Sequence, residues 1–92
     1  MKEIYIVKQE WNYYGDSDYN LTICANEEAA MRIFNEKKSE SIKTFNGEAD
    51  PDRIEDESEE LSADKWYYRI YERDNYYECF EEISVKKEEI VY

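Results

Sequence analysis

Residues 3–25, EIYIVKQEWNYYGDSDYNLTICA, decide the first half of the fold. β-Branched and aromatic residues dominate residues 3–13, and apolar side chains fall on both sides of an extended chain there. That composition is typical of a β-strand. The alternation places Ile4 and Ile6 on one side and Tyr5 and Val7 on the other.

The second part of the same stretch predicts a turn and a returning strand. Residues 14–20, YGDSDYN, are polar and contain a glycine, which favours a turn. Residues 19–25 alternate again and predict a second strand, paired with the first in a hairpin. One face of this strand carries Tyr19, Leu21, Ile23 and Ala25, and the other carries Asn20, Thr22 and Cys24.

A helix is predicted to begin directly after this hairpin. Asn26 is a favoured N-cap, and the acids Glu27 and Glu28 suit the positive end of a helix dipole. Asn46-Gly47 is a plausible end of the helix. The apolar residues that recur at helical spacing are Ala30, Ile33, Phe34, Ile42 and Phe45.

The C-terminal part of the chain predicts a second hairpin. Residues 65–73 and 76–85 read as strands, joined by a turn at Asp74-Asn75. Residues 90–92 extend the last strand or add a short edge strand. The sequence therefore predicts one α+β domain over residues 1–92. It has an antiparallel sheet of about four strands, in the order ββα, acidic segment, ββ, with one main helix packed on one face.

The segment of residues 47–64 separates the two halves and holds nine acids and one base, a net charge of −8. Two structures are open for it. It is a solvated connector, or residues 51–61 form a short helix, with Asp50-Pro51 at the start and an inward stripe of Ile54 and Leu61. Glu59 and Glu60 would then lie at the negative end of the helix dipole, which argues against the helix.

The charge of this segment indicates the kind of partner the protein attracts. The whole chain carries −12, two thirds of it in residues 47–64, and is repelled by nucleic acid and by anionic membrane surfaces. Basic proteins or cations are the attractive partners. As a helix, residues 51–61 would carry about one charge per 3 Å, within a factor of two of duplex DNA at ~1.7 Å. The segment is therefore a candidate nucleic-acid mimic, or a run of charge that keeps a small protein soluble.

Tyrosine is abundant next to this segment, with ten in the whole chain. Tyr is enriched at protein interfaces, although aromatic pairing across an ordinary sheet also uses it. Stacking on single-stranded nucleic acid is disfavoured because the neighbouring side chains are mostly acidic. The candidate partner-binding residues are Asp52, Glu55, Asp56, Glu57, Glu59, Glu60, Trp66, Tyr68, Tyr71, Tyr76 and Tyr77.

The first turn also resembles a calcium loop. Asp16, Asp18, Asn20 and Glu27 match its positions 1, 3, 5 and 12. Leu21 stands where that loop requires glycine, and the preceding residues read as strand, so a hairpin turn is the stronger interpretation and no metal or cofactor is expected.

Catalysis has little support in this sequence. The chain has no His, no glycine-rich phosphate loop and no CxxC motif. Cys24 and Cys79 are expected to be reduced, buried side chains without a His partner. The protein is therefore expected not to be an enzyme.

Four stretches resemble small, acidic, Tyr-rich proteins encoded by bacteriophages and other mobile elements. They are KEIYIVKQEW (2–11), YGDSDYN (14–20), ANEEAAMRIF (25–34) and WYYRIYE (66–72). The resemblance implies an inhibitor of host machinery, of the anti-CRISPR or anti-restriction kind.

Two functions follow as hypotheses. The first is an inhibitor that occupies the basic nucleic-acid-binding surface of a host or defence enzyme. The alternative is a small assembly protein that self-associates, as a homodimer or more, through a Tyr-rich sheet face or a sheet edge. No apolar run approaches the ~20 residues that span a bilayer, and no signal-peptide h-region is present, so residence in the cytoplasm is expected, the host's if the protein is phage-encoded.

Overall fold

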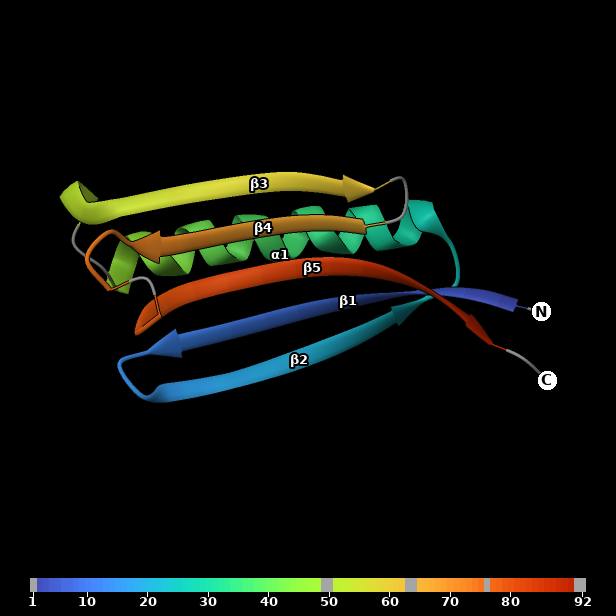
Figure 1. The fold of residues 1–92 in the computed structure, drawn as a ribbon, viewed down its shortest axis with the longest axis horizontal. Coiled ribbons are helices and arrows are strands. Elements are labelled where there is room, and N and C mark those ends of the chain that lie inside the picture. The colour runs from blue at the N-terminus through green and yellow to red at the C-terminus, as the bar shows by residue number, and fades with distance from the viewer. Residues whose placement is uncertain (1, 49–50, 63–64, 76, 91–92) are drawn as a thin grey trace.

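One helix packs on an antiparallel sheet of five strands (Figure 1), in a computed structural model that describes residues 2–48, 51–62, 65–75 and 77–90. The strand order is β2-β1-β5-β4-β3, so β2 and β3 form the two edges. The α+β class and the single helix are confirmed, and the sheet has one strand more than the four expected. The elements are β1 (Lys2–Tyr13), β2 (Asp16–Cys24), α1 (Glu27–Glu48), a 3-10 turn (Pro51–Arg53), β3 (Ile54–Ser62), β4 (Lys65–Glu72) and β5 (Cys79–Ile90).

The β1–β2 hairpin turns over two residues, fewer than the seven-residue polar run suggested. Tyr14 and Gly15 have φ angles of 54° and 99°, and Tyr13 pairs with Asp16. Positive φ at both central residues defines the type I′ turn, whose twist matches that of the flanking strands. The Gly15 N–H donates to Asn12 Oδ1 at 2.9 Å. Glycine is needed at position 15 because it adopts this backbone without steric cost.

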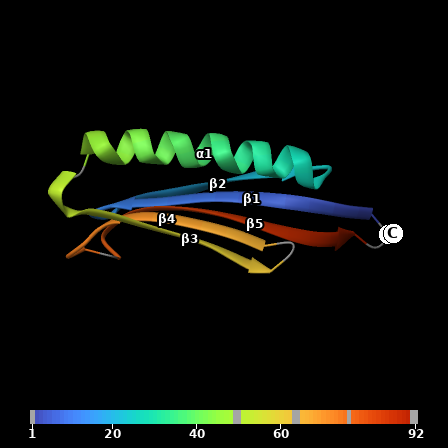
Figure 2. The ribbon, with the colours of Figure 1, turned by 90° about the horizontal axis from the view of Figure 1, so that it is seen from above.

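Helix α1 begins where the sequence places its cap. The Asn26 side chain accepts from the Ala29 N–H at 2.8 Å, which satisfies one of the helix's first free donors. The helix covers one face of the sheet and leaves the other open (Figure 2). It packs most extensively on the central strand β5 and then on β1.

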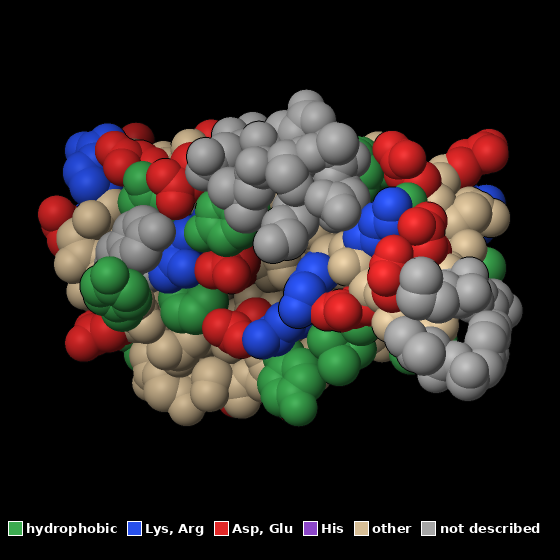
Figure 3. Space-filling model, turned by 45° about the vertical axis from the view of Figure 1, so that its right-hand side comes forward, with side chains coloured by type: hydrophobic (Ala, Val, Ile, Leu, Met, Phe, Trp, Pro, Cys, Tyr) green, Lys and Arg blue, Asp and Glu red, His purple; other side chains and the backbone are tan. Residues whose placement is uncertain are grey.

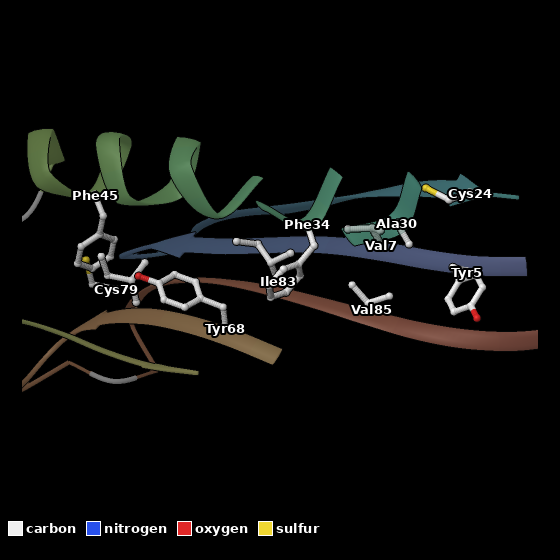
Figure 4. Packing of buried hydrophobic residues seen from close by; sticks show 11 residues of the cluster. Tyr5, Val7, Cys24, Ala30, Phe34, Phe45, Tyr68, Cys79, Ile83 and Val85 are labelled. Carbon is white, nitrogen blue, oxygen red and sulfur yellow. The ribbon is translucent and has the colours of Figure 1, made fainter. Parts of the chain in front are cut away.

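The core lies between α1 and the sheet (Figure 4). Phe45 is fully buried and its ring centroid lies 5.9 Å from that of Tyr13. Cys24 and Cys79 are buried free thiols, as expected from the sequence. The buried hydrophobic residues are Tyr5, Val7, Cys24, Ala30, Phe34, Phe45, Tyr68, Ile70, Cys79, Ile83 and Val85.

The acidic segment is the main correction to the sequence analysis. Residues 54–62 form neither a connector nor a helix. They are the edge strand β3, paired antiparallel with β4 from Ile54↔Glu72 to Ser62↔Lys65. The strand separates neighbouring acids onto opposite faces, where Glu55 and Asp56 find different partners, whereas one helical turn would crowd them.

The last strand begins later than the sequence suggested. Residues 73–75, 77 and 78 belong to the connection between β4 and β5, so Tyr77 lies in a turn and β5 starts at Cys79. The turn is closed by backbone bonds from the Glu78 and Cys79 N–H groups to the Asn75 carbonyl. Tyr76 and residues 91–92 lie outside the described residues.

Candidate functional site

The β3 edge and its β4 neighbour, defined here as the acidic edge, gather most of the residues that the sequence selected. Glu55 points to the open face of the sheet, where Arg73 Nε lies 2.8 Å from its Oε1 and the Tyr71 hydroxyl donates to its Oε2 at 3.3 Å. Asp56 points to the helix side and accepts from the Tyr68 hydroxyl at 3.0 Å. Neighbouring acids of β3 are therefore held on opposite faces by different donors.

Further acids extend this edge outward. Glu57 and, in the 3-10 turn, Asp52 are exposed. The backbones of Glu59 and Glu60 lie in β3 opposite Tyr67 and Trp66, while their side chains lie outside the described part of the chain. Solvated carboxylates on a sheet edge are a known protection against unwanted strand pairing, and the same groups can attract cations.

The aromatic residues of the predicted site do not form one surface. Tyr68 is 1% exposed and belongs to the core, so it offers no contact area to a partner. Burial, with the hydrogen bond to Asp56, raises the pKa of its hydroxyl well above the ordinary value. Trp66 is half-buried against the core, Tyr71 is half-buried on the open face, and Tyr77 is 78% exposed in the β4–β5 turn. Among the described aromatic residues of the predicted site, Tyr77 has the largest accessible surface.

Two arginines near the acidic edge pair with acids that lie outside β3. Arg69 is buried on the open face, where its Nη1 lies 2.6 Å from Glu82 Oε2 and its guanidinium lies 4.1 Å from the Phe80 ring centroid. Arg53 pairs with Asp74 and lowers the pKa of that carboxyl. The strongest negative potential is therefore expected along β3 itself, outside these arginines.

The opposite edge carries a surface that the sequence reasoning did not select. On β2, Tyr19, Leu21 and Ile23 are 58%, 55% and 69% exposed and point away from α1. The sequence placed these three residues on one face of a strand, and an apolar face of a strand usually indicates the side that packs in the core. The helix covers the opposite face of β2 instead, and Cys24 on that face is buried in the core. The open side of the sheet shows hydrophobic side chains among charged ones (Figure 3).

A buried carboxyl group lies beneath α1, also unselected by the sequence analysis. Glu81 is 4% exposed, and burial raises the pKa of its carboxyl. The Tyr13 hydroxyl donates to one of its oxygens, and the Ser41 hydroxyl donates to the other at 2.9 Å. Gln9 donates to Ser41 at 3.2 Å. Carboxylates were too abundant in the sequence for this one to stand out.

A groove of about 660 Å³ opens beside this carboxyl, between α1 and β1. Trp11, Lys43 and Glu40 are among its walls, and Gly47 lies at the end of the helix. Both Glu81 oxygens are already bonded to hydroxyls from within the protein, so Glu81 itself presents no unpartnered oxygen to this groove.

The calcium-loop resemblance does not correspond to a cluster of ligands. Asp16, Asp18 and Asn20 lie at the start of the extended strand β2, whereas Glu27 opens the helix after its far end. Eight residue steps at ~3.3 Å separate the ends of this strand by about 26 Å, too far for one ion. Among the described residues, no group of three or more His, Cys, Asp or Glu side chains is placed to hold a metal.

Within the described ranges, no helix has the length and apolarity needed to cross a membrane. Comparison of the chain with known protein families, with curated proteins and with solved structures found no match.

Proposed function

We propose that this is a non-enzymatic binding protein that inhibits a nucleic-acid-binding host or defence enzyme by occupying its basic surface. The acidic edge carries this proposal. It presents Glu55, Asp56 and Glu57 in succession on a strand that lies at the border of the sheet. A partner can therefore approach it from both faces and from the side.

The spacing of these charges supports the proposal. Consecutive residues of a strand rise ~3.3 Å, close to the ~3.4 Å between charges along one strand of DNA. Per unit length of strand, the carboxylates of residues 55–57 therefore have a similar density, and they alternate between the two faces, so a groove must reach the strand from its outer side to meet all of them. The match is to one nucleic-acid strand, since duplex DNA carries twice that density.

The partner is inferred to be a protein with a surface rich in Lys and Arg. The net charge of −12 repels nucleic acid itself, so the protein competes with nucleic acid and does not bind it. Tyr77 and Tyr71 would add contact area at the end of the edge near the β4–β5 turn, where Tyr is exposed or half-buried.

The experiment is a tagged pull-down from nuclease-treated bacterial lysate, repeated at about 50 and about 200 mM salt. The edge variant is Glu55→Gln, Asp56→Asn, Glu57→Gln, Glu59→Gln and Glu60→Gln. We expect the parent to capture a basic nucleic-acid-binding protein at the lower salt, and added oligonucleotide to release it. The edge variant should lose that capture.

A control variant separates position from total charge. It removes the same five charges at exposed positions elsewhere, namely Glu3→Gln, Glu36→Gln, Glu40→Gln, Glu78→Gln and Glu89→Gln. The proposal expects this variant to keep the partner. Equal loss in both variants would mean that net charge alone drives capture, and unchanged capture by the edge variant would overturn the acidic edge as the binding surface.

The second candidate function is self-association of an assembly protein through a sheet edge. The exposed Tyr19, Leu21 and Ile23 on β2 favour it, because that edge is apolar where the other is acidic. The two functions use different edges and are therefore compatible.

A further inference from the structure

The β2 edge is open along nine residues. It pairs with β1 from Tyr5↔Cys24 to Tyr13↔Asp16 with no shift of register, so it is regular over its whole length. An edge strand carries a row of backbone N–H and C=O groups that pair with no strand of its own sheet. Proteins usually protect such a row with charge, proline or a bulge.

This protection is missing over most of β2. Asp16 and Asp18 lie at its start, but no charged residue occurs from Tyr19 to Cys24. Six large hydrophobic residues are exposed in the described part of the chain, and three of them, Tyr19, Leu21 and Ile23, lie on one face of this strand. Ile6 pairs with Ile23 on the neighbouring strand and is half-buried, which broadens the apolar surface.

We propose that β2 pairs with β2 of a second copy of this chain, in an antiparallel register centred on Leu21. The strand is self-complementary in that register. Leu21 lies opposite its own copy, and Tyr19 lies opposite Ile23 of the other copy. Directly opposed residues share a face, so all three apolar side chains of each chain meet on the open side of the sheet.

Neighbouring registers are less favourable. Centring the pair on Asn20 places Ile23 opposite Ser17, and centring it on Ile23 places Tyr19 opposite Glu27, beyond the strand. Centring the pair between two consecutive residues would place a residue of the open face opposite a residue of the helix side, which a continuous sheet does not allow. Centring the pair on Thr22 places Leu21 opposite Ile23 but leaves Tyr19 opposite Ala25, which lies beyond the strand. The Leu21 register alone therefore pairs all three large apolar residues of β2 with one another.

The charge distribution also favours this contact between two acidic chains. Asp18 and its copy lie six residue steps apart, about 20 Å at ~3.3 Å per residue. The acidic edge lies four strand spacings from β2, about 19 Å, which exceeds the ~8 Å screening length at physiological salt. Most of the net charge therefore lies far from the contact, and the ten-stranded sheet so formed has an acidic edge at each end.

The first test is sedimentation equilibrium of the full chain over a concentration series. We expect a monomer–dimer equilibrium in the parent and at least a tenfold weaker association in Leu21→Lys, with the same circular dichroism and melting temperature. Glu57→Lys, an exposed position on the other edge, is the matched control and should keep the dimer. A parent that stays monomeric at high micromolar concentration overturns the proposal, as does a dimer that survives Leu21→Lys.

The second test fixes the register by oxidative cross-linking. Leu21→Cys brings two thiols opposite each other at the Cα separation that a disulfide needs, about 4.4–6.8 Å. In Ile23→Cys the two thiols lie four residue steps apart, about 13 Å, so this variant should not cross-link. The native Cys24 and Cys79 are buried, and the parent serves as the blank. Cross-linking of Ile23→Cys but not of Leu21→Cys would overturn the register.

Discussion

The two edges of this sheet meet the same structural problem in opposite ways. Both β2 and β3 are nine residues long and carry outward backbone groups. β3 is lined with carboxylates, two of which are tied to Arg73 and Tyr68, while β2 is uncharged from Tyr19 onward. Charge on an edge repels strands and attracts cations, whereas an apolar edge invites another strand. The difference suggests that the molecule offers two surfaces to two kinds of partner.

The largest effect on stability is expected from a substitution in the core, because both edges of the sheet rest on the same core. Phe45→Ala removes a fully buried ring that packs at a tilt against Tyr13 and should lower the free energy of unfolding by about 3–5 kcal/mol. Urea denaturation measures this loss, and hydrogen exchange follows the two edges separately. Both edges should lose protection together, because one core supports them. Loss of protection at β2 alone would mean that β3 is an independent unit.

An intermediate effect compares a buried and an exposed arginine behind the acidic edge. Arg69→Met removes a buried guanidinium from its 2.6 Å pair with the half-buried Glu82 and should cost about 1.5–3 kcal/mol. Arg73→Met breaks the exposed pair with Glu55 and should cost less than about 1 kcal/mol. Chemical denaturation of both variants measures the contrast. Equal costs would show that the acidic edge depends on its outer ion pair as much as on its inner one.

A smaller effect concerns the turn that holds β2. Gly15→Ala places a side chain at a φ of 99° and should destabilise the protein by about 1 kcal/mol. Gly47→Ala is the control, because neither glycine has a heavy atom within 4 Å of an added Cβ and only Gly15 has positive φ. Gly47 lies in the last turn of α1, where alanine favours the helix, so this variant should be neutral or slightly stabilised. A similar cost in both variants would contradict the backbone explanation.

The smallest effect is a pH dependence from the buried carboxyl that neither edge uses. Because the pKa of Glu81 is raised above 4.5, the folded state holds this proton more tightly than the unfolded chain. The parent's free energy of unfolding therefore falls as the pH rises from that ordinary value through the raised pKa. Glu81→Gln removes this component, so the variant should gain stability relative to the parent over the same window. Thermal melts across the acidic range measure the difference, and a constant difference would exclude a raised pKa.

Much of the fold could be predicted because its local signals are strong. The alternation in residues 3–13 and the Asn26 cap located β1 and the start of α1 to within a residue. The strand β3 was missed because the spacing of Ile54 and Leu61 matches a helix. The segment is a strand because it pairs with β4, and a local sequence pattern does not reveal that pairing.

The site was harder to predict than the fold, because periodicity does not say which face is covered. Tyr68 was expected at a contact surface and lies in the core, while Tyr19, Leu21 and Ile23 had the pattern of a core and lie in solvent. The choice is made by where α1 packs. Alternation within one strand contains no information about that packing.

The measurement that tests the difference between the edges most directly is amide chemical-shift mapping of the labelled protein during titration with an arginine-rich peptide at about 50 mM salt. The account predicts shifts concentrated in residues 55–60 and the facing residues of β4, lost in the edge variant and kept in the charge-matched control. Residues 19–24 of β2 should not respond. Shifts spread evenly over the acids of the whole chain, or centred on β2, would contradict it.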